Sequence, residues 1–281
     1  MRRIGFGAIA AFISVSAAAA ALNTLPAAPP QLSAAEIVAR NVAARGGLEA
    51  WRRIETMVWT GRVEGARGSA SAMPFALELR RPNKTRFEVT AIDQRFTRIF
   101  DGEQGWRLRP GRGGAPEVKP FSAEEANYAR DEFVIDGPLI DYQAKGVAVA
   151  LAGVDELEGR KAYLLNVKLA SGAERRVWID AQTFLEVRSD RPSSNPLVKG
   201  SPVSVYYRDY RSIEGLQIPL TIESRSLPGA AVEKVVIDKV SLNPKLPDFA
   251  FAKPGTPRQR HAIVRVGGES SPPSAAGRPG P

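Results

Sequence analysis

The feature that most constrains this chain is an alternation of apolar and polar residues that recurs from Thr56 to Val240. Successive side chains of a strand point to opposite faces, so each alternating segment predicts a strand with one apolar face. Turn residues such as Asp101-Gly102 and Glu214-Gly215 separate the segments. The pattern predicts a long antiparallel meander of about 11 strands.

Two helices are predicted beside these strands, at Ala34–Arg45 and at Ala123–Phe133. Each follows a serine that has a glutamate three residues later, the pattern of a capping box. The expected fold class is therefore α+β. A sheet of this length curls as it twists, and helices over its mouth would cover an apolar cavity. The plainer alternative is that the inner face is filled by packed core.

The ends of the chain differ in composition from its middle. Residues 1–21 contain a charged start, a short apolar run and a series of alanines, which is typical of a cleaved signal peptide. We expect a linker at 22–32, one folded domain at 33–254 and a disordered, basic, Pro/Gly-rich tail at 255–281. This organisation predicts a protein secreted into the periplasm.

The sequence lacks the residues and motifs that several kinds of catalytic and metal-binding site require. The 281-residue sequence has no cysteine, and its single histidine, His261, lies in the tail. No nucleophile elbow, zinc motif or phosphate-binding loop is present. We therefore expect no catalytic residue, no metal and no cofactor. The net charge of +9 is concentrated at the two ends, and no basic run with aromatic residues indicates nucleic-acid binding.

The segment Tyr206–Ser224 resembles a catalytic cluster because acids and arginines stand beside tyrosines. Strand alternation places Tyr206, Arg208 and Tyr210 on one face, and Val205, Tyr207 and Asp209 on the other. Asp209 would then need a basic partner from a neighbouring strand. Asp101 and Asp180 fit ordinary turn positions, where aspartate accepts bonds from its own backbone. We interpret all these residues as structural.

Six stretches taken in order resemble the LolA/LolB-like superfamily of periplasmic lipoprotein-sorting proteins. They are GGLEAWRRIETMVWTGRVEG, FDGEQGWRLRP, DGPLIDYQAKG, ERRVWIDAQTFLEVRSD, YYRDYRSIEGLQIP and LNPKLPDFAFAKP. The resemblance covers residues 33–254. It implies an unclosed antiparallel β-barrel with helices as a lid over an apolar cavity that holds acyl chains. The chain differs from LolB in lacking a lipid-bearing cysteine, and its basic tail has no counterpart.

The resulting hypothesis is a soluble, monomeric periplasmic carrier of lipid or lipoprotein acyl chains. It would exchange its cargo with handover proteins at the inner and outer membranes. The alternative is an RseB-like envelope-stress sensor that binds a partner protein without transport. The predicted lipid-binding residues are Trp59, Phe75, Leu77, Leu79, Phe87, Val89, Phe96, Trp106, Leu108, Leu165, Val167, Val177, Ile179, Val205, Tyr207, Ile218 and Leu220.

Overall fold

A computed structural model describes residues 32–65, 72–111, 115–132, 134–193, 202–226 and 232–255. The predicted signal peptide lies outside these residues, as do the linker apart from Leu32 and the tail apart from Gly255. All the described helices and strands belong to one compact unit that begins at Ser33.

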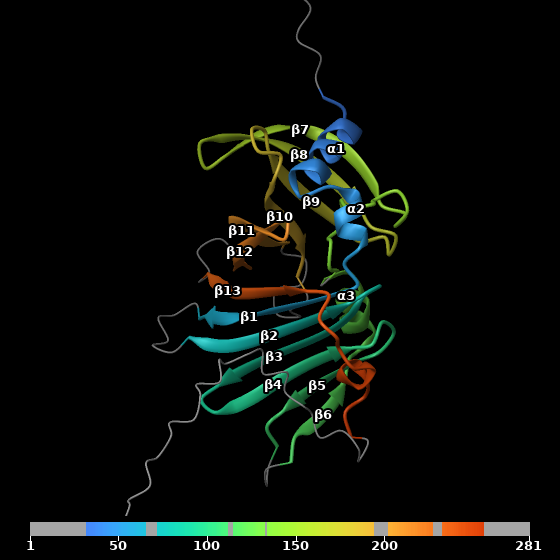
Figure 1. Ribbon diagram of the computed structural model, residues 1–281, viewed down its shortest axis with the longest axis vertical. Helices are drawn as coiled ribbons and strands as arrows, with labels where there is room; N and C mark the ends of the chain where they lie inside the picture. The colour runs from blue at the N-terminus through green and yellow to red at the C-terminus, as the bar shows by residue number, and fades with distance from the viewer. Residues whose placement is uncertain are drawn as a thin grey trace, which may run out of the picture. The chain divides into compact units, whose positions relative to one another are not determined.

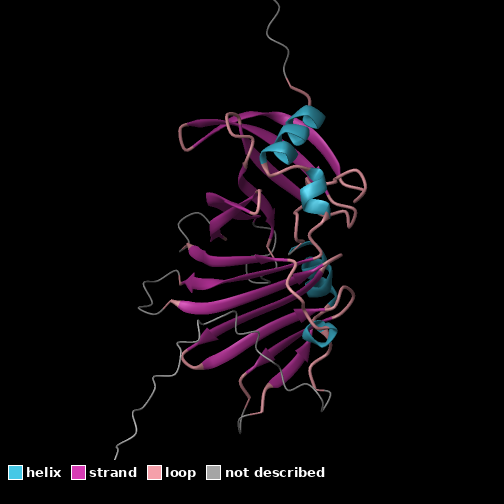
Figure 2. Ribbon diagram, in the orientation of Figure 1, coloured by secondary structure: helices cyan, strands magenta, loops and turns pink. Residues whose placement is uncertain are grey.

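Figure 2 shows the helices in cyan, and the two predicted from capping signals are among them. They are α1 (Ala34–Ala44), α2 (Leu48–Arg52), α3 (Ala123–Glu132) and the short 3-10 helix η3 (Asp248–Phe251). Before α1, the Ser33 side chain accepts from the Glu36 N–H while Glu36 accepts from the Ser33 N–H, which is a complete capping box. Ser122 and Glu125 form the same reciprocal pair before α3. Both predicted helices are therefore present.

The strands form a single antiparallel sheet of 13 members, which is not closed (Figure 1). They are β1 (Thr56–Glu64), β2 (Met73–Arg80), β3 (Lys84–Ala91), β4 (Gln94–Phe100), β5 (Gly105–Arg109), β6 (Glu117–Pro120), β7 (Ala148–Leu157), β8 (Arg160–Lys168), β9 (Glu174–Asp180), β10 (Glu186–Pro192), β11 (Pro202–Ile213), β12 (Leu216–Arg225) and β13 (Glu233–Leu242). The predicted fold class, an open antiparallel barrel-like sheet with few helices, is confirmed.

The strand order corrects the expectation of one continuous meander. The order is β6-β5-β4-β3-β2-β1-β13-β12-β11-β10-β9-β8-β7, so two meanders meet where the first strand pairs with the last. The segment after β6 carries α3 and leads from one edge of the sheet to β7 at the other edge. Alternation identifies strands but not distant neighbours, which is why the β1–β13 junction was not expected.

Gly61 allows this junction to form. The register between β1 and β13 shifts at Thr60/Gly61, where the two backbones approach closely. A Cβ atom at Gly61 would lie 2.0 Å from the carbonyl oxygen of Val236, far inside van der Waals contact. Only glycine fits at this position without movement of β13.

The two faces of the sheet are covered by different parts of the chain. On β2, the buried side chains of Phe75, Leu77 and Leu79 define what we call the cavity face. On the opposite face, η3 lies over β3 and forms a small cluster with Val58. α1 packs near β7, where its Asn41 amide donates to the Phe184 carbonyl at 2.7 Å.

A candidate lipid-binding cavity

A cavity of about 990 Å³ lies on the cavity face of the sheet. Its walls come from β1–β3 and β9–β13, together with the end of α3 and residues 134–147. The apolar residues that line it are Trp51, Trp59, Phe75, Leu77, Leu79, Phe87, Val134, Ile135, Val147, Leu169, Val205, Ile218, Ile222 and Val235. This volume is at the upper end of the range for small-molecule sites, about 300–1,000 Å³.

Eight of the predicted lipid-binding residues line the cavity. They are Trp59, Phe75, Leu77, Leu79, Phe87, Val205, Tyr207 and Ile218. Val89 and Leu220 pack against the same hydrophobic cluster without being part of the lining. Phe96 is the cross-strand neighbour of Val89, so it lies on the same face of the sheet. The predicted apolar face is thus largely assembled around one space.

Four further predicted residues are buried in another part of the sheet. Leu165 and Val167 on β8 pair with Val177 and Arg175 on β9. Leu165, Val177, Ile179 and Val167 are at most 1% exposed, and none of them lines the main cavity. Leu165, Val177 and Ile179 are therefore packed core, which was the plainer of the two expectations, whereas Val167 lines a second hollow described below.

Trp106 and Leu108 were expected with the others but lie on the opposite face of the sheet. The register pairs Trp106 with Ile99 and Leu108 with Thr97, whereas Phe87 pairs with Arg98. Residues 97 and 98 point to opposite faces, so Trp106 and Leu108 point away from Phe87. Alternation within the β5 segment could not show which of its two faces would turn toward the cavity.

Asp209 and Tyr210 also depart from the expected alternation. Asp209 has a φ of +53°, and it and Leu220 are left unpaired between β11 and β12, although the register on either side is the same. This break in the extended backbone places Tyr210 in the cavity with Tyr207, and the Tyr210 hydroxyl donates to the Glu186 carbonyl at 2.8 Å. Asp209 is instead exposed, and its partner is Arg211 of the same strand at 3.0 Å. The expected partner on a neighbouring strand was wrong.

The remaining acids and arginines of the suspected clusters hold turns and strands together. Arg208 pairs with Glu223 across β11 and β12 and with Glu158 in the β7–β8 turn. Asp101 accepts from two backbone N–H groups of its own turn, and Asp180 accepts from two in the following turn. These contacts agree with the structural interpretation.

A buried polar network fastens the segment 134–147 over the cavity. The Asp136 carboxylate is 2% exposed and pairs with Arg81 at 2.8 Å and with Lys145. Arg81 also donates to the backbone carbonyls of Trp51 and Ile54, at 2.9 and 2.7 Å. Burial lowers the pKa of Lys145. Because Arg81 follows β2 directly, these bonds connect the covering segment to the sheet.

Two other carboxyl groups line the cavity and have longer or fewer hydrogen bonds than Asp136. Glu132, at the end of α3, contacts Arg191 and the Tyr128 hydroxyl, both at 3.3 Å. Burial raises the pKa of Glu132 to about 7. Glu186 is 8% exposed, and burial raises its pKa as well. No hydrogen bond to the Glu186 carboxylate is found within the part of the chain that the structure describes. Both groups gain protons far more readily than surface glutamates.

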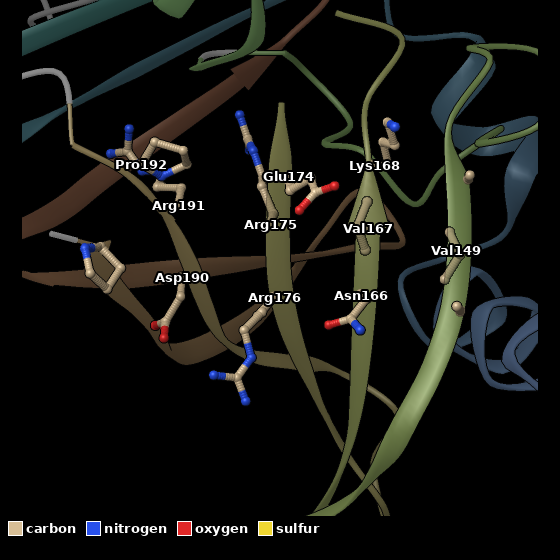
Figure 3. A pocket seen from close by; sticks show the side chains of 13 residues that line it. Val149, Asn166, Val167, Lys168, Glu174, Arg175, Arg176, Asp190, Arg191 and Pro192 are labelled. Carbon is tan, nitrogen blue, oxygen red and sulfur yellow. The ribbon is translucent and has the colours of Figure 1, made fainter. Parts of the chain in front are cut away.

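A second hollow of about 700 Å³ lies at the end of the sheet formed by β7–β11. Figure 3 shows its lining residues, with Arg175 and Arg176 of β9 pointing in opposite directions. Arg175 and Arg191 line this hollow and the main cavity alike. The two spaces therefore meet at these arginines.

Sequence reasoning missed the charged residues that line the cavity, which are Arg45, Arg81, Arg130, Asp131, Glu132, Asp141, Lys145, Arg175, Glu186, Arg191 and Glu233. One signal was available for Arg175, because it alternates in step with the inward-facing Val177 and Ile179. No comparable signal places Lys145, which lies in a turn segment between α3 and β7. Among the described residues, no group of three or more acidic or histidine side chains could hold a metal, and no helix is long and apolar enough to cross a membrane.

Comparison with solved structures identifies the fold. A DUF1329 family protein from Desulfovibrio piger aligns with a TM-score of 0.53 and 12% identity, over 78% of this chain and 97% of the other. A LolA superfamily protein from Nitrosomonas europaea aligns with a TM-score of 0.52 and 14% identity, over 79% of this chain and 99% of the other. A domain from Vibrio parahaemolyticus, described as an outer membrane lipoprotein-sorting protein, aligns with a TM-score of 0.52 and 12% identity, over 77% of this chain and 94% of the other.

The chain has the fold of the LolA superfamily. At these identities the likeness establishes the architecture alone. No protein-family model matches the sequence, and no curated protein is significantly similar to it.

Proposed function

We propose that this protein is a periplasmic carrier that binds acyl chains of lipids or lipoproteins in its cavity. The observation that carries the proposal is the space of about 990 Å³ bounded by apolar side chains from both halves of the sheet. An acyl chain placed there would gain about 0.8 kcal/mol for each CH₂ group removed from water. Such binding needs no catalytic group, and the LolA-type fold supports the same role.

The periplasm is the proposed compartment because residues 1–21 have the pattern of a cleaved signal peptide. A carrier in that compartment could exchange cargo with proteins at the inner and outer membranes. This transfer step is part of the proposal, and it rests on the cavity and on the shared fold.

The first experiment is native mass spectrometry of the mature protein purified from periplasm without detergent. A stoichiometric lipid mass, identified after solvent extraction, is the expected result. A protein that stays free of lipid even after incubation with membranes would contradict the carrier proposal. That outcome would favour the partner-binding module as the alternative.

Two substitutions test whether the lipid occupies this cavity. Leu77 and Phe87 are cross-strand neighbours that both line it, and the rings of Phe75 and Phe87 lie 5.9 Å apart. Leu77→Glu and Phe87→Glu should abolish lipid uptake because each places a carboxylate against the acyl chain. Val154→Glu is the matched control, since Val154 is 49% exposed on β7 and outside the lining. Normal uptake by a folded Phe87→Glu protein would exclude the cavity as the binding site.

A further inference from the structure

Two arginines lie opposite each other at one end of the mainly apolar cavity. The register pairs Val177 with Ser189 and Arg176 with Asp190, and its continuation by one residue places Arg175 of β9 opposite Arg191 of β10. Both arginines line the cavity. Like charges on directly opposed strand positions are destabilising unless something of opposite charge lies near them. The pair therefore needs a counter-ion.

The acids nearby supply little compensation. Arg191 has Glu132 as its ion-pair partner, at a long distance of 3.3 Å. Arg175 donates to the backbone carbonyl of Asp131 at 2.6 Å. Burial raises the pKa of Glu132 to about 7 and also raises the pKa of Glu186. With a pKa of about 7, Glu132 carries only part of its negative charge at neutral pH, and burial likewise disfavours the charged form of Glu186.

Other donors converge on the same region. Arg45 lies close enough to Glu186 and Tyr207 to act on both electrostatically. Loss of hydration raises the pKa of Tyr207 to about 12, so its hydroxyl keeps its proton and can donate a hydrogen bond. Guanidinium groups present forked N–H donors that match carboxylate and phosphate oxygens. The surroundings of Arg175 and Arg191 thus combine positive charge with hydrogen-bond donors.

The position of the two arginines within the cavity determines how a bound amphiphile would be oriented. Trp59, Phe75 and Phe87 provide an apolar wall on β1–β3, whereas the arginines project from β9 and β10. The arginines also border the second hollow at the end of the sheet. An amphiphile can therefore lie with its chain along β1–β3 and its head at the arginines.

We propose that Arg175 and Arg191 bind the oxyanion headgroup, a carboxylate or a phosphate, of an acyl amphiphile held in the cavity. This inference rests on the proposed function, because it assigns the head of a ligand whose chain occupies the apolar wall. Guanidinium–oxyanion pairing supplies selectivity that apolar burial alone cannot provide.

The test compares three probes of equal chain length with delipidated mature protein: hexadecanoate, hexadecyl phosphate and hexadecanol. Binding is measured with radiolabelled probes, separating bound from free by gel filtration. We expect at least one of the anions to bind about tenfold more tightly than the neutral alcohol, as a charged hydrogen bond contributes about 1.5–3 kcal/mol. The preferred anion distinguishes a carboxylate head from a phosphate head.

Variants then assign the preference to the arginines. Arg175→Gln and Arg191→Gln should each weaken binding of the preferred anion roughly tenfold and change hexadecanol binding less than about twofold. Arg176→Gln is the matched control, because Arg176 is exposed and points away from Arg175 (Figure 3). Circular dichroism checks that each variant folds.

The outcomes separate this inference from the carrier proposal. Equal affinity of the wild-type protein for the alcohol and both anions would overturn the headgroup site while leaving the apolar cavity in place. Anion selectivity that persists in both folded arginine variants would overturn the assignment to Arg175 and Arg191. Failure of all three probes to bind would count against the proposed function itself.

Discussion

Replacing Glu132 by glutamine should stabilise the protein at alkaline pH and leave its stability unchanged in acid. The Glu132 side chain is 14% exposed, and burial raises its pKa from an ordinary 4.5 to about 7. Between these values the folded state holds a proton that the unfolded state has released. The stabilisation from this proton is complete below pH 4.5 and is lost as the pH rises through 7.

The size of the effect follows from the same two values. A pKa difference of about 2.5 corresponds to about 3 kcal/mol, since one pKa unit is 1.36 kcal/mol. Glutamine keeps an oxygen that can accept from Arg191 and Tyr128, but it cannot ionise. Glu132→Gln should therefore match the wild type at pH 4 and exceed it by up to about 3 kcal/mol at pH 9.

Urea unfolding across this pH range, followed by tryptophan fluorescence, measures the difference in unfolding free energy. Glu103→Gln is the control, because Glu103 is exposed in a turn and should give the same curve as the wild type. A Glu132→Gln difference that does not change between pH 4 and pH 9 would show that the carboxyl is not held protonated by its surroundings.

Three further changes should act on stability through single contacts, each measured by urea unfolding. Asp136→Ala leaves the partly buried Arg81 and Lys145 without their carboxylate and should cost about 3 kcal/mol, the lower end of the range for a buried ion pair; a loss below about 1 kcal/mol would show that this network does not hold the segment 134–147 in place. Gly61→Ala forces a Cβ against the Val236 carbonyl and should cost about 1–3 kcal/mol, and an unchanged midpoint would contradict that close approach. Ile92→Asn should stabilise by about 1 kcal/mol, because exposed Ile92 has a φ of +47° in a two-residue hairpin that favours asparagine; destabilisation would refute this reading.

Local signals in the sequence were sufficient to predict most of the helices and strands of the fold. Capping boxes located α1 and α3, and alternation predicted about 11 strands where the sheet has 13; the four-residue β6 was not predicted. The strand order was beyond these signals, since alternation carries no information about pairing between β1 and β13. The close approach of the two backbones at Gly61 can be inferred only once the pairing of β1 with β13 is known.

The candidate site was predictable where residues share a face in regular strands and unpredictable where the backbone departs from them. Phe75, Leu77 and Phe87 were placed by alternation alone. Tyr210 was assigned to the wrong face because the positive φ of Asp209 interrupts the alternation. The segment that contains Asp136 and Lys145 has no period that places it over the cavity, so its charges could be found only from tertiary contacts.

The pairing of β1 with β13 has a consequence for the order in which the sheet can fold as the chain is synthesised. Met57 pairs with Leu242, so this ladder joins segments at opposite ends of the folded chain. When the chain emerges with its N-terminus first, β1 has β2 on one side and an open row of N–H and C=O groups on the other until β13 arrives. Contacts between such distant segments form slowly, and the open edge is a template for association with other chains in the meantime. Truncation before β13 should accordingly yield an aggregating product rather than a smaller working domain.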